Sequence, residues 1–87
     1  MVIVLLHDGH TERLGRELMS IDALFQKAHE KHRQKKFEAA AKLYREVLGF
    51  QPDHLDANYL LGTVYAETGR GAEAEPYLVK AAELDPV

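Results

Sequence analysis

The chain contains no cysteine, and this absence excludes several kinds of chemistry. It rules out a disulfide framework, a thiolate metal site and a cysteine nucleophile. Long hydrophobic runs are absent too. The N-terminal run MVIVLL is far shorter than the roughly 18 to 20 apolar residues of a membrane span. It also lacks the basic start of a signal peptide. We therefore expect a cytoplasmic protein with no membrane partner.

Signatures of catalysis are also lacking. The serine and threonine hydroxyls lie in no nucleophile elbow or glycine-rich context, and no nucleophile–base pair is evident. There is neither a phosphate-binding loop nor a dinucleotide fingerprint. The sequence therefore predicts a protein that is not an enzyme and that needs no cofactor.

Three polar clusters resemble ligand sites, but each has a simpler explanation. The stretch HDGH, residues 7–10, lies between glycine-flanked bends without a rigid support. His29 and His32 share a helix face, but no third ligand is clearly placed beside them. The basic run KAHEKHRQKK, residues 27–36, is interrupted by Glu30 and has no interleaved aromatic residues. We expect neither a bound metal nor a nucleic-acid partner.

The composition is that of one small globular domain. Of the 87 residues, 46% are hydrophobic and 29% are charged, a balance that favours folding over disorder. The charge is uneven along the chain. Residues 1–49 carry nine Lys and Arg against seven Asp and Glu, whereas residues 50–87 carry two against seven. Such asymmetry favours either a head-to-tail contact or simply differently charged solvated faces.

Hydrophobic periodicity predicts an all-α protein. Apolar residues recur at three-and-four spacing, which is typical of amphipathic helices. Pro52 interrupts the pattern, Asp53 is a suitable cap for the helix that follows, and Gly69 suits a left-handed helix end. The predicted helices span residues 21–34, 37–50, 55–68 and 71–84. Short loops make neighbouring helices antiparallel.

Residues 1–20 do not share this periodicity. Residues 10–19 have the pattern of a helical turn or a little more, but Gly9 and Gly15 disfavour it. We expect residues 1–20 to form an extension, partly disordered or a short helix, and residues 1–18 to have no role in the core.

An internal repeat organises residues 21–87. A shift of 34 residues aligns the two halves without a gap, so that Asp22-Ala23 matches Asp56-Ala57 and Pro52 matches Pro86. Ala40 likewise matches Ala74. A period of this length, with two helices in each unit, is typical of helical repeat proteins. The predicted units are residues 21–54 and 55–87.

At these residues the sequence resembles the tetratricopeptide repeat (TPR) family. The second unit carries Leu61-Gly62, Tyr65, Ala74, Ala81 and Pro86 at the family's positions, with Asn58 where the family often has Trp. The first unit departs from the pattern at Lys27 and Lys31. The resemblance implies two antiparallel helical hairpins stacked as a short TPR solenoid, with an N-terminal extension.

The resemblance also implies a function in binding proteins. In the family, the first helices of successive units line a concave groove that holds a peptide or a partner helix. By position, this groove is lined here by Phe25, Gln26, His29, His32, Arg33, Tyr59, Leu60, Thr63 and Glu67. For Tyr59 and Leu60, packing against a neighbour is an equally good interpretation. Phe25, His29 and Leu60 occupy the places of a chaperone-tail clamp, so no chaperone adaptor is expected.

Two other functions stay open. TPR segments also recruit substrates for, or regulate, larger enzymes such as glycosyltransferases. Alternatively, the chain associates with itself, as a homodimer through the last helix. The outer face of that helix has no capping helix after it in this sequence, so we expect a fragment of a longer array, a pair of copies, or a face covered by residues 1–20, with the fragment favoured. The sequence does not identify the partner.

Overall fold

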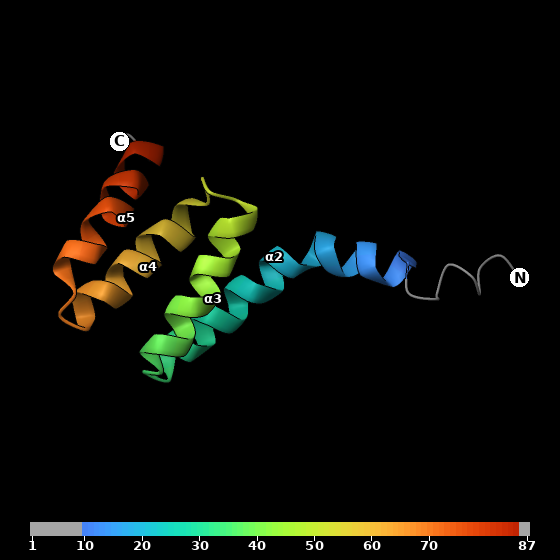
Figure 1. The fold of residues 1–87 in the computed structure, drawn as a ribbon, viewed down its shortest axis with the longest axis horizontal. Coiled ribbons are helices and arrows are strands. Elements are labelled where there is room, and N and C mark those ends of the chain that lie inside the picture. Colours follow the sequence, from blue (N-terminus) through green and yellow to red (C-terminus); the bar gives the residue numbers. More distant parts are fainter. Residues whose placement is uncertain (1–9, 86–87) are drawn as a thin grey trace, which may run out of the picture.

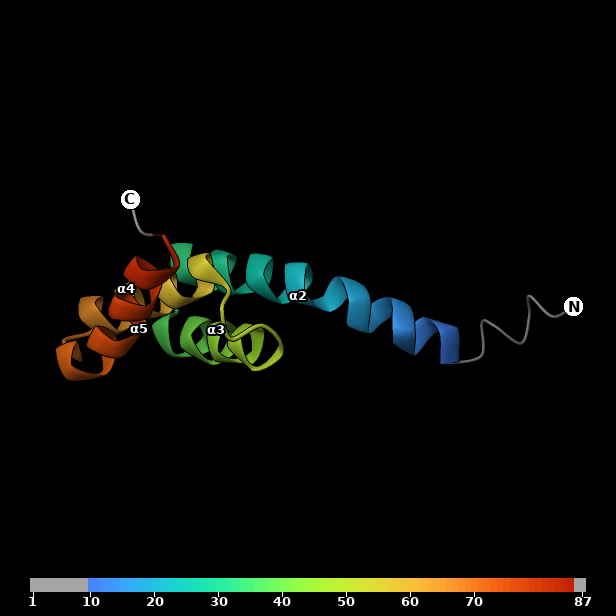
Figure 2. The same cartoon turned by 90° about the horizontal axis from the view of Figure 1, so that it is seen from above.

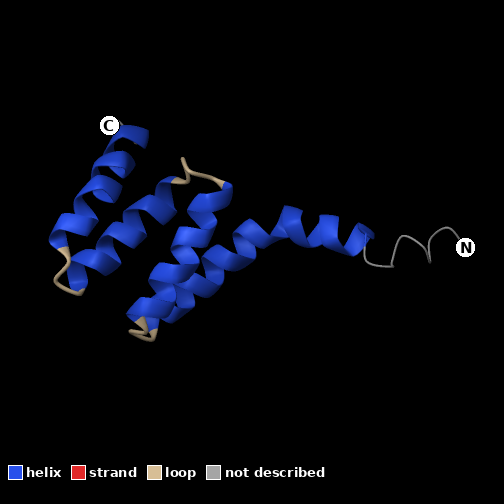
Figure 3. Ribbon diagram, viewed as in Figure 1, coloured by secondary structure: helices blue, strands red, loops and turns tan. Residues whose placement is uncertain are grey.

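Four helices make up the part of the chain that the structure describes. This computed structural model describes the backbone of residues 10–85 and the side chains of residues 21–85. The helices are α2 (His10–Arg33), α3 (Phe37–Phe50), α4 (Leu55–Glu67) and α5 (Gly71–Leu84) (Figure 1). No strand occurs within residues 10–85, so the fold is all-α as predicted (Figure 3). No helix in this range is long and apolar enough to cross a membrane.

The start of the first helix differs from the prediction. We expected the helix to begin at residue 21, but α2 begins at His10 and passes through Gly15 and Ser20 without a break. Its N-terminal half projects beyond the other helices in two perpendicular views (Figures 1 and 2). The boundary proposed between an extension and the repeats therefore lies inside one helix. The predicted lack of a core role for residues 1–18 concerns side chains outside the described residues.

The other helices follow the predicted ranges closely. α3 and α5 have the predicted bounds, and α4 ends one residue earlier than expected, at Glu67. Gly69 has a φ of 78°, the left-handed conformation predicted for this helix end. The amide of Arg70 donates to the carbonyl of Tyr65 at 2.7 Å, which satisfies one of the carbonyls that the end of α4 leaves free.

Each helix packs on the next one in the chain, so that α2 pairs with α3, α3 contacts α4, and α4 pairs with α5. Small side chains lie where the paired helices cross. Ala28 and Ala40 are fully buried in the first hairpin, and Ala74 is 2% exposed in the second. Tyr44 and Leu61, both fully buried, fill the space beside these crossings. The core thus follows the internal repeat.

The loop between the hairpins is fixed by polar side chains. His54, not Asp53 as predicted, caps α4, because its Nδ1 accepts a hydrogen bond from the amide of Ala57 at 3.1 Å. Asp53 instead pairs with Lys80 of α5 at 3.0 Å. The buried amide of Asn58 donates to the carbonyls of Pro52 and His54 at 3.0 and 2.9 Å. These bonds set the angle at which the second hairpin leaves the first.

The buried Tyr44 makes the stability of the fold sensitive to alkaline pH. Burial raises the pKa of Tyr44 from 10 to about 12. Below pH 10 the Tyr44 phenol is neutral in both the folded and unfolded states, so the free energy of unfolding does not depend on its titration. As the pH rises from 10 to 12, the unfolded chain loses this proton first, which lowers the free energy of unfolding. We expect wild type to lose up to about 2 kcal/mol relative to Tyr44→Phe over this range, measured by urea unfolding. Parallel curves for the two proteins would contradict this prediction.

Candidate partner-binding groove

The first helices of the two hairpins, α2 and α4, meet through side chains at two places. Phe25 of α2 contacts His54, the cap of α4, with ring centroids 5.1 Å apart. Farther along both helices, His32 of α2 contacts Glu67 of α4 at 2.8 Å. Since both contacts advance in the same direction along the chain, the two helices run roughly parallel. The predicted groove residues lie on these two helices, and the groove itself stays a prediction.

An aromatic cluster forms one end of the groove. The rings of Phe25 and His29 are stacked, with centroids 6.3 Å apart and planes 4° from parallel. Phe25 also contacts the ring of Tyr44 at 5.9 Å, which ties the cluster to the core. Phe25 is half-buried, whereas His29 is exposed. The imidazole of His29 is therefore accessible, whereas the ring of Phe25, on which it stacks, is held against the core.

A polar network forms the other end. The Nε2 of His32 donates to the carboxylate of Glu67, and its Nδ1 lies 3.3 Å from the hydroxyl of Tyr44. The side chain of His32 is only 14% exposed. His32 thus joins the two hairpins, and its ring is largely engaged in this role.

On α4, two neighbouring residues of the predicted groove differ in exposure. Tyr59 is 53% exposed, and Leu60 beside it is half-buried against the core. The hydroxyl of Thr63 donates to the carbonyl of Tyr59 at 2.9 Å, one turn back along the helix. Packing against a neighbour was the alternative to a groove role for both residues. Leu60 packs against the core, whereas Tyr59 stays largely exposed. On α2, Gln26 is exposed toward solvent.

Arg33, which also belongs to the predicted groove, is paired within its own helix. Its guanidinium donates to Glu30 at 2.8 Å. This bond, together with one from Gln34, lowers the pKa of the Glu30 carboxyl. Both partners are exposed, so the pair contributes little stability and is readily exchanged for another anion. Arg33 lies at the edge of the groove as a positive charge with a local counter-ion.

His54 was missed as a groove residue. It lies in the loop before α4, whereas the family pattern places groove residues only on the first helix of each unit. Its position as the cap of α4 turns the ring toward Phe25. The sequence signal for this role is weak, because histidine is a less common cap than its neighbour Asp53.

The predicted absence of a metal site has a limited structural counterpart. Among the described residues, no three His, Asp or Glu side chains gather as metal ligands. The stretch HDGH lies outside the described residues in all but the backbone of His10. The absence of a metal therefore stays a prediction.

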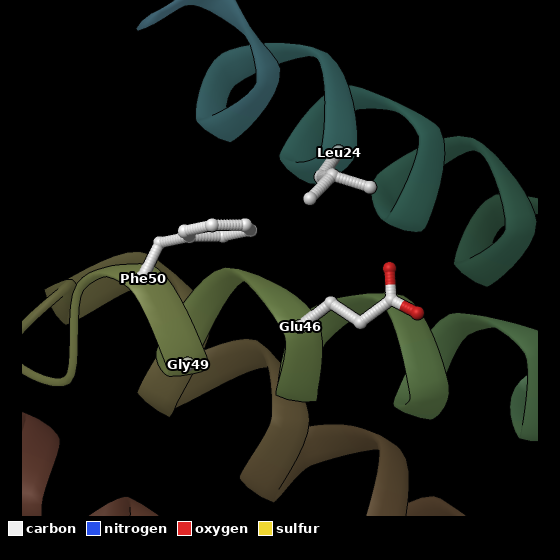
Figure 4. A pocket seen from close by; sticks show the side chains of 4 residues that line it. All are labelled: Leu24, Glu46, Gly49 and Phe50. Carbon is white, nitrogen blue, oxygen red and sulfur yellow. The ribbon is translucent and has the colours of Figure 1, made fainter. Parts of the chain in front are cut away.

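A second surface feature lies outside the groove. An open hollow between α2 and the end of α3 is lined by Leu24, Glu46, Gly49 and Phe50 (Figure 4). Phe50 is 56% exposed at its edge. In the internal repeat Leu24 corresponds to Asn58, whose side chain hydrogen-bonds to the loop before α4. Leu24 has no such loop before it, since α2 continues as a helix.

Two hairpins of the same design, whose first helices contact each other side by side, define a helical-repeat protein. The family model described as "Tetratricopeptide repeat" matches residues 23–87. The chain therefore belongs to the tetratricopeptide repeat family, as the sequence motifs indicated. Protein O-mannosyl-transferase TMTC2 of Homo sapiens is 43% identical over 51 residues. This match covers 59% of the chain but only 6% of the length of that much longer relative.

Proposed function

We propose that this chain is a protein-interaction module that binds a segment of a partner in the groove between α2 and α4. The observation that carries the proposal is the exposure of Tyr59, 53%, on the first helix of the second hairpin. A large aromatic residue that stays accessible offers apolar area to a ligand at low entropic cost. Binding, rather than catalysis, is the activity that we propose.

The groove favours a partner segment with a central apolar or aromatic side chain. Tyr59 and the stacked pair of Phe25 and His29 supply flat ring surfaces for that side chain. The hydrogen-bonded pair of His32 and Glu67 closes one end, and each of these side chains already has the other as a hydrogen-bond partner. Arg33, just beyond, favours an acidic residue in the partner after the apolar one. An extended peptide or one face of an amphipathic helix meets these requirements.

Replacement of Tyr59 by alanine should weaken binding without unfolding the chain. Loss of one exposed aromatic anchor typically costs about 2 kcal/mol of binding free energy, or roughly thirtyfold in Kd. The probe is a peptide selected on wild type from a random-peptide phage library, with Kd measured by isothermal titration calorimetry. His29→Ala should weaken binding of the same peptide less, because the imidazole ring is smaller than the tyrosine side chain.

Val79→Ala is the matched control for this experiment. Val79 is 48% exposed, much like Tyr59, but it lies on α5, outside the groove. Its replacement should leave Kd unchanged. Equal effects of the Tyr59 and Val79 variants, or unchanged binding in the Tyr59 and His29 variants, would reject the groove as the binding surface.

A second candidate function is substrate recruitment for a glycosyltransferase. The observation that favours it is the similarity to a protein named as an O-mannosyl-transferase, although the match covers only 6% of that protein. In this role the same groove would bind the acceptor protein. The test is to sequence the transcript that encodes the chain and to assay its whole product for mannosyl transfer. A transcript without a transferase domain would exclude this role and leave the interaction module intact.

A further inference from the structure

The junction between the two hairpins provides a template for contacts with another copy. α3 faces α4 through the positions of Glu38, Ala41 and Arg45, which lie three and four residues apart. Arg45 donates to the hydroxyl of Tyr65 at 2.7 Å, and Arg70 donates to Glu38 at 3.1 Å. Ala41, between them, is 1% exposed. This junction buries one face of α3 and one face of α4.

The face of α5 that corresponds to the buried face of α3 is exposed. A shift of 34 residues carries Ala41 to Glu75, Arg45 to Val79 and Leu48 to Ala82. Glu75 and Ala82 are exposed, and Val79 is 48% exposed. The repeat thus leaves exposed on α5 the positions whose counterpart Ala41 on α3 is buried within the chain. We call this surface the α5 face, which comprises Ala72, Glu75, Val79, Ala82 and Glu83.

The face of α2 that corresponds to the buried face of α4 is also accessible, and it is basic. On α4 this face holds Leu61 and Tyr65, which are 0% and 4% exposed. The same shift carries these positions to Lys27, which is exposed, and Lys31, which is half-buried. We call this surface the α2 face, which comprises Ala23, Lys27, Lys31 and Lys36.

The two faces are complementary in charge. The α5 face contributes Glu75 and Glu83, whereas the α2 face contributes three lysines. Glu30, the acid nearest these lysines on α2, is already bonded to Arg33 and Gln34. Lys80, the basic residue of α5, is bonded to Asp53. Neither of these neighbours cancels the charge difference between the two faces.

We propose that a second copy of this chain stacks head to tail on the first, with the α5 face of one copy against the α2 face of the next. The two helices would adopt the relation that α3 and α4 have within the chain. Val79 and Ala82 would lie under the alkyl stems of Lys27 and Lys31, whose ammonium groups would reach the glutamates. Because the contact joins two different faces, the stack is heterologous and continues beyond a dimer. This proposal does not depend on use of the groove.

A charge-swap experiment tests the proposal. The first variant, Lys27→Glu with Lys31→Glu, makes the α2 face acidic. The second variant, Glu75→Lys with Glu83→Lys, makes the α5 face basic. The readout is the average mass by sedimentation velocity over a range of protein and salt concentrations. Circular dichroism checks that each variant folds, which is expected because these side chains are exposed or half-buried.

The mass of the wild type should rise with concentration past that of a dimer, and it should fall with added salt. Each variant alone sets like charges against each other, so it should associate at least about tenfold more weakly. An equimolar mixture of the two variants restores opposite charges at both kinds of junction and should regain the wild-type mass.

Other outcomes would overturn the proposal. A wild type that stays monomeric at every concentration contradicts it. An equimolar mixture that associates as weakly as either variant alone also contradicts it. A symmetric dimer through two α5 faces would leave association of the first variant intact and would be weakened only in the second.

Discussion

Replacement of Gly62 by leucine is expected to unfold the protein. Gly62 is buried where α4 crosses α5. A Cβ at this position would lie 2.6 Å from Cδ2 and 2.7 Å from Cγ of Leu78, and 3.3 Å from the carbonyl oxygen of Ala74. Since Cγ is close to the backbone and the carbonyl belongs to it, rotation of Leu78 alone does not relieve the clash. The cost should exceed the usual 1 to 3 kcal/mol or so of overpacking, and two small hairpins have little stability in reserve.

Two further variants identify the crossing as the cause. Gly49, on α3, has no atom within 4 Å of an added Cβ, so Gly49→Ala should stabilise the helix by up to about 1 kcal/mol. Removal of the obstructing side chain by Leu78→Ala in the Gly62→Leu background should recover part of the lost stability. Helicity and thermal unfolding, followed by circular dichroism, provide the measurements. A Gly62→Leu protein as stable as wild type would mean that the helices do not cross as closely as described.

Replacement of Leu61 by alanine should be nearly as damaging. Leu61 is 0% exposed and packs in the core together with Val64 and Tyr44. Truncation of a fully buried leucine typically costs about 2 to 5 kcal/mol, because the cavity left behind closes only in part. For a domain of this size such a loss is comparable with the whole stability. We expect the variant to be largely unfolded at 37 °C.

The neighbouring leucine is a matched control. Leu60 is half-buried and packs against the edge of the core rather than in its centre. Leu60→Ala should therefore cost clearly less stability than Leu61→Ala, although it should weaken binding of the selected peptide. Urea unfolding of both variants compares the two directly. If the two losses were equal, the assignment of Leu61 to the core and Leu60 to the groove would be wrong.

Most of the fold could be predicted because burial leaves a periodic pattern in the sequence. α3, α4 and α5 each pack on a neighbour, so their apolar residues recur at helical spacing, and Pro52 and Gly69 mark their limits. The first half of α2 projects beyond α3 in Figures 1 and 2. A helix without a neighbour needs no apolar stripe, so the sequence held only a short periodic signal for residues 10–20.

The contacts between α2 and α4 could be predicted only in outline. The repeat placed Phe25, Tyr59 and Glu67 on first helices, but a repeat pattern does not reveal which side chains meet across two helices. The contact of His32 with Glu67 depends on the angle between the hairpins. That angle is set by the loop in which Asn58 and His54 bond to the backbone. These bonds are local along the chain, whereas Asp53 pairs with Lys80 of α5, a tertiary contact that the sequence pattern did not reveal, and Asp53 was therefore mistaken for the cap.

The most direct test of the groove is a nuclear magnetic resonance titration. Isotope-labelled chain is titrated with a peptide selected on wild type from the random-peptide library, and changes in the backbone amide signals are mapped onto the helices. If the partner lies between α2 and α4, the largest changes occur at Gln26, His29, Tyr59 and Thr63. Changes centred on the hollow beside Phe50 or on the α5 face, with these four signals unmoved, would contradict binding in the groove.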